Sequence, residues 1–310
     1  MSTKHDTFNG SSHGVFVQSA HGWRGALGGF VAVGSRLNNE NKNIWVFDKD
    51  LVQQASYDVG SPYLFDVAAH NGGFVVVGER YDNKTVWRCN ADGSVDWTYD
   101  AGDSDGRGVA TDTSGNVYVA ASPGIWKLDA SGSLVWYYNA IPEGASNMLM
   151  RSIVVSDDGA VYACGIVIGG PIGTRYTLWK LTMDGSLIWR TRNVVGSLNS
   201  VGVKNDRVIC AGPLSTPPYP GGPRYIVEEY DTSGAAISQH IPVSGPDYAA
   251  GLCVCPVGSN WFVGSNRVIS GGIVRRVSQI GSTACYDTGL ETIVYGIAPD
   301  EEEEHIFCVG

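Results

Sequence analysis

Arginine and tyrosine recur in the long, unrepeated segments of this 310-residue chain. These two residue types give a surface large contact areas with polar tips, and both are enriched at recognition sites. They predict recognition of a protein or a glycan. The candidate binding residues are Arg80, Tyr81, Arg175, Tyr176, Tyr219, Arg224, Tyr225 and Tyr248.

No catalytic motif accompanies these residues. The sequence lacks HExxH, GxSxG, SxxK, P-loop and GxGxxG patterns. The six histidines are dispersed, the seven cysteines include no CxxC pair, and the Asp-rich turns do not have EF-hand spacing. We therefore expect no catalytic residues of a known motif, no metal and no cofactor.

Charge and hydropathy exclude further classes of partner. The chain carries 21 basic and 31 acidic residues, a net charge of −10, and it has no extended basic cluster that could bind the phosphates of a nucleic acid. No apolar run is long enough to insert into a membrane. The first residues lack the pattern of a signal peptide, so we expect cytoplasmic synthesis.

A short apolar segment that ends in a small residue repeats seven times, with starts 43 to 52 residues apart. This period and the 41 glycines favour a β-propeller whose blades are sheets of four antiparallel strands, here called A to D. The repeated segment is predicted to be strand B. Its copies are residues 28–34, 72–78, 115–121, 159–165, 206–212, 258–264 and 304–310.

The other strands follow from their position relative to strand B. Strand A is predicted at residues 64–70, 106–112, 151–157, 198–204, 249–255 and 293–299, and strand C at 43–48, 85–90, 124–129 and 177–182. Cys164, Cys210 and Cys308 fall within strand B where other copies have Val or Ala, so we expect them to be buried free thiols.

The turn between strands C and D has its own repeated chemistry. In "LDASGSLVW" at residues 128–136, Asp can bond back to the backbone and Gly can adopt a positive φ. Trp97, Trp136 and Trp189 each follow the glycine of such a turn by four residues. A large apolar side chain at a repeated position of an outer strand predicts packing between neighbouring blades.

This turn resembles the repeat of quinoprotein-type (PQQ-like) β-propellers. "VATDTSGNVYVAA" at residues 109–121 is similar to the A–B segment of other bacterial propeller repeats. The resemblance extends over nearly the whole chain and implies the propeller fold, but it implies no cofactor.

The ring is expected to close through its ends. The last copy of strand B, at residues 304–310, is followed by no strand C or D, whereas residues 6–20 align with the C–D hairpin at 126–140. We expect a single all-β domain over residues 1–310, a seven-bladed propeller in which residues 5–20 form the C–D hairpin of the blade built by residues 292–310. Such closure covers a sheet edge that would otherwise be open to aggregation.

Loop length distinguishes the two faces of this propeller. The A–B and C–D turns are short, whereas several B–C and D–A connections are long and irregular, and they carry the candidate Arg and Tyr residues. The long connections are residues 35–43, 79–84, 139–148, 166–176, 213–225, 244–251 and 265–272.

The expected function is therefore a non-enzymatic binding or assembly module that uses the B–C/D–A face. A phage virion or tail component, a lectin-like protein and a bacterial scaffold are all compatible with this class. The alternative is a propeller enzyme, a lyase or hydrolase, with its site at the mouth of the central channel.

Overall fold

The computed structural model describes most of the chain, and its described residues contain strands and turns but no helix. These residues are 17–23, 29–35, 42–48, 52–102, 104–169, 175–191, 198–214, 224–240, 253–257, 260–266, 272–277, 283–287, 296–299 and 306–309. No segment among them is therefore a helix that could cross a membrane.

The described strands form six four-stranded sheets and one pair, here numbered I to VII in chain order. Sheet I contains β1 (Val17–Trp23), β2 (Gly29–Gly34), β3 (Ile44–Asp48) and β4 (Gln53–Tyr57). Sheet II contains β5 (Leu64–His70), β6 (Gly73–Tyr81), β7 (Lys84–Asn90) and β8 (Val95–Tyr99). Sheet III contains β9 (Gly106–Thr111), β10 (Val117–Ala121), β11 (Gly124–Leu128) and β12 (Leu134–Asn139).

The remaining sheets repeat this order. Sheet IV contains β13 (Asn147–Val155), β14 (Ala160–Ile168), β15 (Arg175–Thr182) and β16 (Leu187–Thr191). Sheet V contains β17 (Ser200–Lys204), β18 (Arg207–Leu214), β19 (Arg224–Asp231) and β20 (Ala236–His240). Sheet VI contains β21 (Cys253–Val257), β22 (Asn260–Asn266), β23 (Gly272–Val277) and β24 (Thr283–Asp287), and sheet VII contains β25 (Gly296–Pro299) and β26 (Ile306–Val309).

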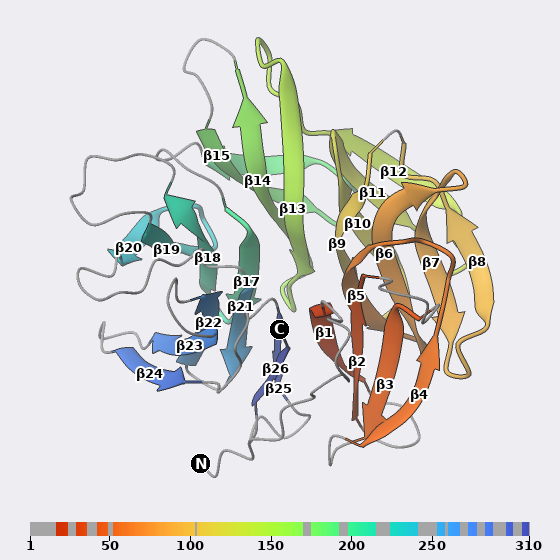
Figure 1. Cartoon of the computed structure of the whole chain (residues 1–310). Helices are drawn as coiled ribbons and strands as arrows, with labels where there is room; N and C mark the ends of the chain where they lie inside the picture. Colours follow the sequence, from red (N-terminus) through yellow and green to blue (C-terminus); the bar gives the residue numbers. More distant parts are fainter. Residues whose placement is uncertain are drawn as a thin grey trace.

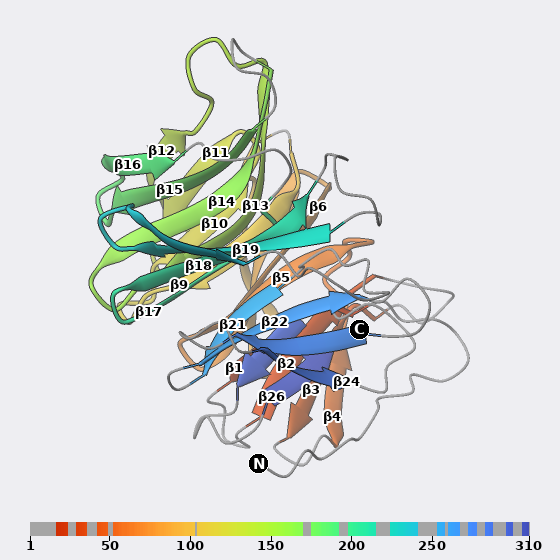
Figure 2. The same ribbon diagram turned by 90° about the vertical axis from the view of Figure 1, so that its left-hand side faces the viewer.

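The sheets are arranged around a common centre as the blades of a propeller. Within each four-stranded sheet the strands pair in chain order and antiparallel, and the first strand lies nearest the centre (Figure 1). Each first strand contacts the first strand of the next sheet, and β25 contacts both β21 and β1. Turning the molecule by 90° shows neighbouring sheets stacked face to face (Figure 2).

The observed strands confirm most of the sequence-based positions and correct two of them. Residues 79–84, predicted as a long irregular loop, instead continue β6 and β7, with Tyr81 paired to Lys84. The prediction was wrong because Asp82 and Asn83 both adopt positive φ, which permits a two-residue hairpin turn. Residues 17–20, assigned to the closing hairpin, lie in β1 and pair with β2; residues 5–16 lie outside the described residues.

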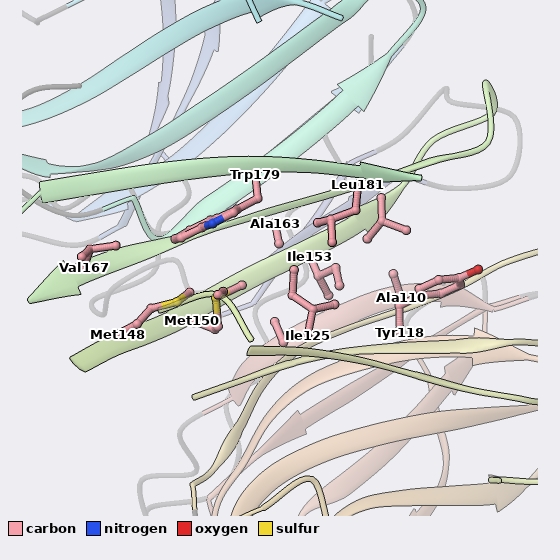
Figure 3. Close-up of a cluster of buried hydrophobic side chains, with 13 residues drawn as sticks. Ala110, Tyr118, Ile125, Met148, Met150, Ile153, Ala163, Val167, Trp179 and Leu181 are labelled. Atoms are coloured by element: carbon pink, nitrogen blue, oxygen red, sulfur yellow. The ribbon is translucent and has the colours of Figure 1, made fainter. Parts of the chain in front are cut away.

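The hydrophobic core lies between neighbouring sheets. One cluster joins sheet III, through Tyr118 and Ile125, to sheet IV, through Met150, Ile153 and Trp179 (Figure 3). Corresponding clusters join sheets I and II, II and III, IV and V, and V and VI. Sheets II to V therefore bury both faces against their two neighbours, and these blades stabilise one another.

The tryptophan that follows the C–D turn connects one sheet to the next, as the repeat predicts. Trp136 in β12 donates its indole N–H to the backbone oxygen of Met183 in the C–D turn of sheet IV, at 3.0 Å. The indole lies directly on Gly185, where an added Cβ would come 2.8 Å from Cδ2 of Trp136. Gly185 has a φ of +87°, a conformation that favours glycine.

The same contact recurs around the ring. Trp97 donates to the backbone oxygen of Ala130 at 3.2 Å, and Trp189 donates to that of Thr232 at 3.1 Å. The indole of Trp97 lies on Gly132, and the indole of Trp189 lies on Gly234. In each case the glycine belongs to the turn whose carbonyl accepts the hydrogen bond of that indole. The repeated turn and its tryptophan therefore serve the joint between blades.

A lysine of strand C strengthens two of these joints. Lys127 Nζ donates to the oxygen of Met183 at 3.0 Å, and Lys180 Nζ donates to that of Thr232 at 3.0 Å. Each carbonyl therefore accepts hydrogen bonds from a lysine and an indole of the preceding sheet.

The aspartates and the described cysteines have structural roles. Asp129 Oδ1 accepts hydrogen bonds from the backbone N–H groups of Ser131 and Ser133, which closes the C–D turn as predicted. Cys89, Cys164 and Cys210 are buried free thiols, so the prediction for Cys164 and Cys210 is confirmed. Burial raises the pKa of the Cys164 and Cys210 thiols, which keeps both in the neutral form.

Candidate functional site

The B–C and D–A connections emerge at one face of the propeller, here called the loop face. The inner strands begin at this face, so the first residues of β5, β9 and β13 lie at the same face, nearest the centre of the ring. The opposite face carries the short A–B and C–D turns. A site at the loop face can therefore combine loop residues with inner-strand residues.

A β-bulge interrupts the start of four inner strands at the same repeat position. The register shifts between Val17 and Ser19, Leu64 and Asp66, Gly106 and Gly108, and Met150 and Ser152. The extra residues are Gln18, Phe65, Arg107 and Arg151. Bulges re-aim side chains and are over-represented beside functional sites.

Three of these bulge residues form a row across adjacent inner strands. We call Phe65, Arg107 and Arg151 the inner-strand cluster. The guanidinium carbon of Arg107 lies 3.8 Å from the ring centroid of Phe65, a cation–π contact between sheets III and II. Arg107 is also paired with Asp105, with Nη2 2.7 Å from Oδ2.

Arg151 differs from Arg107 because it has no counter-ion among the described residues. Its Nε is buried and has no hydrogen-bond partner there. Burial lowers the pKa of Arg151, and the nearby positive charge of Arg107 lowers it further. Two arginine charges therefore lie close together, and among the described residues only Arg107 has an acidic partner.

The loop residues Arg80 and Tyr81 lie beside this cluster at the tip of the β6–β7 hairpin. Arg80 donates to both carboxylate oxygens of Asp100, at 3.1 and 2.8 Å, and its backbone N–H donates to Asp105 at 3.3 Å. Asp105 thus links Arg80 to Arg107. Tyr81 is 51% exposed, and Tyr63, just before β5, is 46% exposed.

The structure describes the other six predicted binding residues only in part. The backbones of Arg175 and Tyr176 begin β15, and those of Arg224 and Tyr225 begin β19. The side chains of these four residues, and the whole of Tyr219 and Tyr248, lie outside the described residues. For all six, a binding role stays a prediction.

Sequence reasoning missed Tyr63, Phe65, Arg107 and Arg151. The signal of Phe65, Arg107 and Arg151 is present in the repeat: the aligned strand-A segments read "LFDV", "GRGV", "MRSI" and "LNSV". The second position holds a large or polar residue, whereas the first and fourth positions are glycine or apolar. The bulge that explains this position is visible only in the strand pairing.

The described residues bring together no metal site. Among them, no three His, Cys, Asp or Glu side chains are close enough to hold a metal ion. In the same part of the chain, the cluster offers arginine N–H groups and an aromatic ring, which suit the binding of an oxyanion.

Comparison with known proteins supports the fold. The sequence matches no protein-family profile and no curated protein. The structure is similar to the WD40 domain of Pan2 from Neurospora crassa, with a TM-score of 0.68 and 11% identity over 95% of this chain and 86% of that one. It is also similar to a protein of unknown function from Bacteroides caccae, with a TM-score of 0.53 and 14% identity over 74% of this chain and 80% of that one.

These similarities support a β-propeller without supporting the quinoprotein-type repeat in particular. At such low identity they show the fold alone. The chain is an all-β propeller of four-stranded antiparallel blades.

Proposed function

We propose that this chain is a non-enzymatic binding or assembly module that recognises a protein partner through its loop face. The observation that carries the proposal is the gathering of two exposed tyrosines, Tyr63 and Tyr81, with Arg80 and Arg107 at that face. Tyrosine and arginine are the residues that most often dominate binding energy at protein interfaces.

The contacts that hold the β6–β7 hairpin in place support the same proposal. Arg80 is held by both oxygens of Asp100, and the two-residue turn at Asp82 and Asn83 fixes the hairpin that carries Tyr81. A surface that is ordered before binding loses less conformational entropy when it binds. WD40 domains, whose fold is similar, commonly mediate protein interactions.

The number of blades and the closure of the ring belong to the same proposal. We infer seven blades, with residues 5–16 completing sheet VII as its C–D hairpin. The contacts of β25 with both β21 and β1 support this inference, because they put sheet VII between sheets VI and I. A hairpin on the outer side of β26 would cover its open edge.

Several finer expectations stay hypotheses. They are the quinoprotein-type repeat, a glycan partner, a role in a virion or phage tail, and cytoplasmic synthesis. The enzyme alternative would place a lyase or hydrolase site at the channel mouth, where Arg107 and Arg151 are the candidate charged groups.

The protein-binding proposal is tested by affinity capture with variants of the purified chain. A double variant, Tyr63→Ser with Tyr81→Ser, removes the two exposed rings of the loop face. The matched control is Ile188→Ser, which removes an apolar side chain that is 49% exposed on the outer strand β16. A second loop-face variant lacks residues 214–222.

We expect the wild type and Ile188→Ser to capture the same partner equally. Both loop-face variants should fail to capture it. Truncation of one interface anchor typically costs about 2 kcal/mol or more, which weakens binding roughly 30-fold. A partner held equally by all four proteins would contradict the use of this face.

A further inference from the structure

Arg151 is expected to destabilise the folded state at its place on the inner strand. Its Nε is buried without a hydrogen-bond partner in the described part of the chain, and the charge of Arg107 lies close by. Burial of an unpaired charge beside a like charge disfavours the folded state. Such a cost is often found where a protein uses the group to bind something.

Arg107 is positioned to act with Arg151. Asp105 holds one end of its guanidinium, and the ring of Phe65 supports its face. The hydrogen bond to Asp105 uses one of five N–H donors, so others stay available for a ligand. The two arginines come from adjacent strands, β9 and β13, and both sit in bulges at the same repeat position.

We propose that Arg107 and Arg151, at the start of the inner strands β9 and β13, form a carboxylate-binding site that receives an acidic group of the protein partner. This inference rests on the proposed function and names the chemistry of that site. A carboxylate between the two guanidinium groups would accept charge-assisted hydrogen bonds from both and would offset their mutual repulsion.

A single carboxylate fits this site better than a polyanion. The chain has a net charge of −10, Asp105 is paired with Arg107, and Asp100 is paired with the nearby Arg80, so a strongly charged ligand such as a nucleic acid would be repelled. The carboxylate of Asp66 is already engaged, because its oxygens accept the N–H groups of Val67 and Val109. A compact, singly charged group on a peptide meets these limits.

The test uses fluorescent peptides and the full-length chain. One peptide carries several glutamates and an amidated C-terminus. A second is neutral, with a free C-terminal carboxylate, and a third is its amidated form. Arg151→Met removes the unpaired charge, and Arg190→Met is the matched control, because Arg190 is exposed on the outer strand β16 and its loss changes the net charge equally.

Fluorescence anisotropy should show binding of at least one carboxylate-bearing peptide to the wild type and none of the neutral amidated one. Preference between the first two peptides identifies an acidic side chain or a C-terminus as the source. Arg151→Met should weaken binding by about 10- to 100-fold, as expected for losing one charge-assisted hydrogen bond, and Arg190→Met by less than about 2-fold.

The melting temperature gives a second, independent measurement. Because Arg151 lacks a described partner, Arg151→Met should melt at the same temperature as the wild type or above it. A purely structural arginine would instead lower the melting temperature when replaced. A lower melting temperature of Arg151→Met, together with unchanged peptide binding, would overturn the proposal.

Failure of this proposal is distinguishable from failure of the proposed function. If no peptide binds the wild type, or if Arg190→Met weakens binding as much as Arg151→Met, the carboxylate site is wrong. Loss of a captured partner on changing Tyr63 and Tyr81 would still support the protein-binding face.

Discussion

The joint between sheets III and IV predicts an energetic coupling between Trp136 and Lys127. Both side chains donate to the backbone oxygen of Met183, each at 3.0 Å. Removing one donor leaves the oxygen with the other, whereas removing both leaves it without a protein partner. The pair is therefore suited to a double-mutant cycle, in which Trp136→Phe and Lys127→Met are made singly and together.

The magnitudes follow from the contacts that each change removes. Trp136→Phe loses one hydrogen bond but keeps an aromatic ring near Gly185 and Tyr118, so we expect about 1–2 kcal/mol of lost unfolding free energy. Lys127→Met loses one hydrogen bond and a cation–π contact 5.1 Å from the ring centroid of Tyr118, which together cost about 1–2 kcal/mol. The double variant should cost more than the sum, by about 0.5–1 kcal/mol.

The unfolding free energy is measured by urea denaturation, followed by circular dichroism. The control is a second cycle in which Val135→Thr replaces Trp136→Phe, because Val135 is 53% exposed on the same strand. That cycle should be additive within about 0.3–0.5 kcal/mol. A Trp136–Lys127 cycle that is also additive would refute the shared acceptor.

Three further perturbations test the joints and the closure of the ring. Gly185→Ala should lower the unfolding free energy by about 1–2 kcal/mol because of its φ of +87°, and by more because the indole of Trp136 lies 2.8 Å from the new Cβ. The control is Gly72→Ala, which has a φ of +76° but no atom within 4 Å of the new Cβ. In urea denaturation this control should show the backbone effect alone. Burial lowers the pKa of His70 from its ordinary 6.5, and the neutral ring is hydrogen-bonded to the backbone oxygen of Gly115 at 2.8 Å. The neutral ring should therefore stabilise the fold fully above pH 6.5, and progressively less as the pH falls through the lowered pKa. His70→Gln should flatten this part of the stability–pH curve, and an unchanged curve would exclude the effect. Deleting residues 1–15 should lower the melting temperature by many degrees or abolish solubility while sparing β1, and a deletion variant as stable as the full chain would exclude the closing hairpin.

The repeated parts of the fold could be predicted because their signals are local. Asp129 and Gly132 make a turn through hydrogen bonds within five residues, and the alternation of apolar residues marks a strand wherever it pairs. The inter-blade role of Trp136 also followed from the repeat, since a large apolar residue at the same position of three blades needs a neighbour to cover it. Such features are fixed by short-range chemistry and by a period of about 44 residues.

The candidate site could be predicted only in part. Arg80 and Tyr81 were identified from their residue types, but the segment that carries them is a tight hairpin rather than an irregular loop. The pairing of Arg80 with Asp100 joins residues 20 positions apart, and no periodic signal marks such a contact.

The sequence by itself determined the propeller, its strand order and the turn chemistry that joins its blades. Only the tertiary structure decided which side chains meet at the starts of the inner strands. Phe65, Arg107 and Arg151 are more than 40 residues apart from one another in sequence. They form one row because three neighbouring inner strands each have a bulge at the same repeat position. A bulge depends on the register between two strands, and the contact between bulges depends on how the blades pack, so neither is determined by any local stretch of residues.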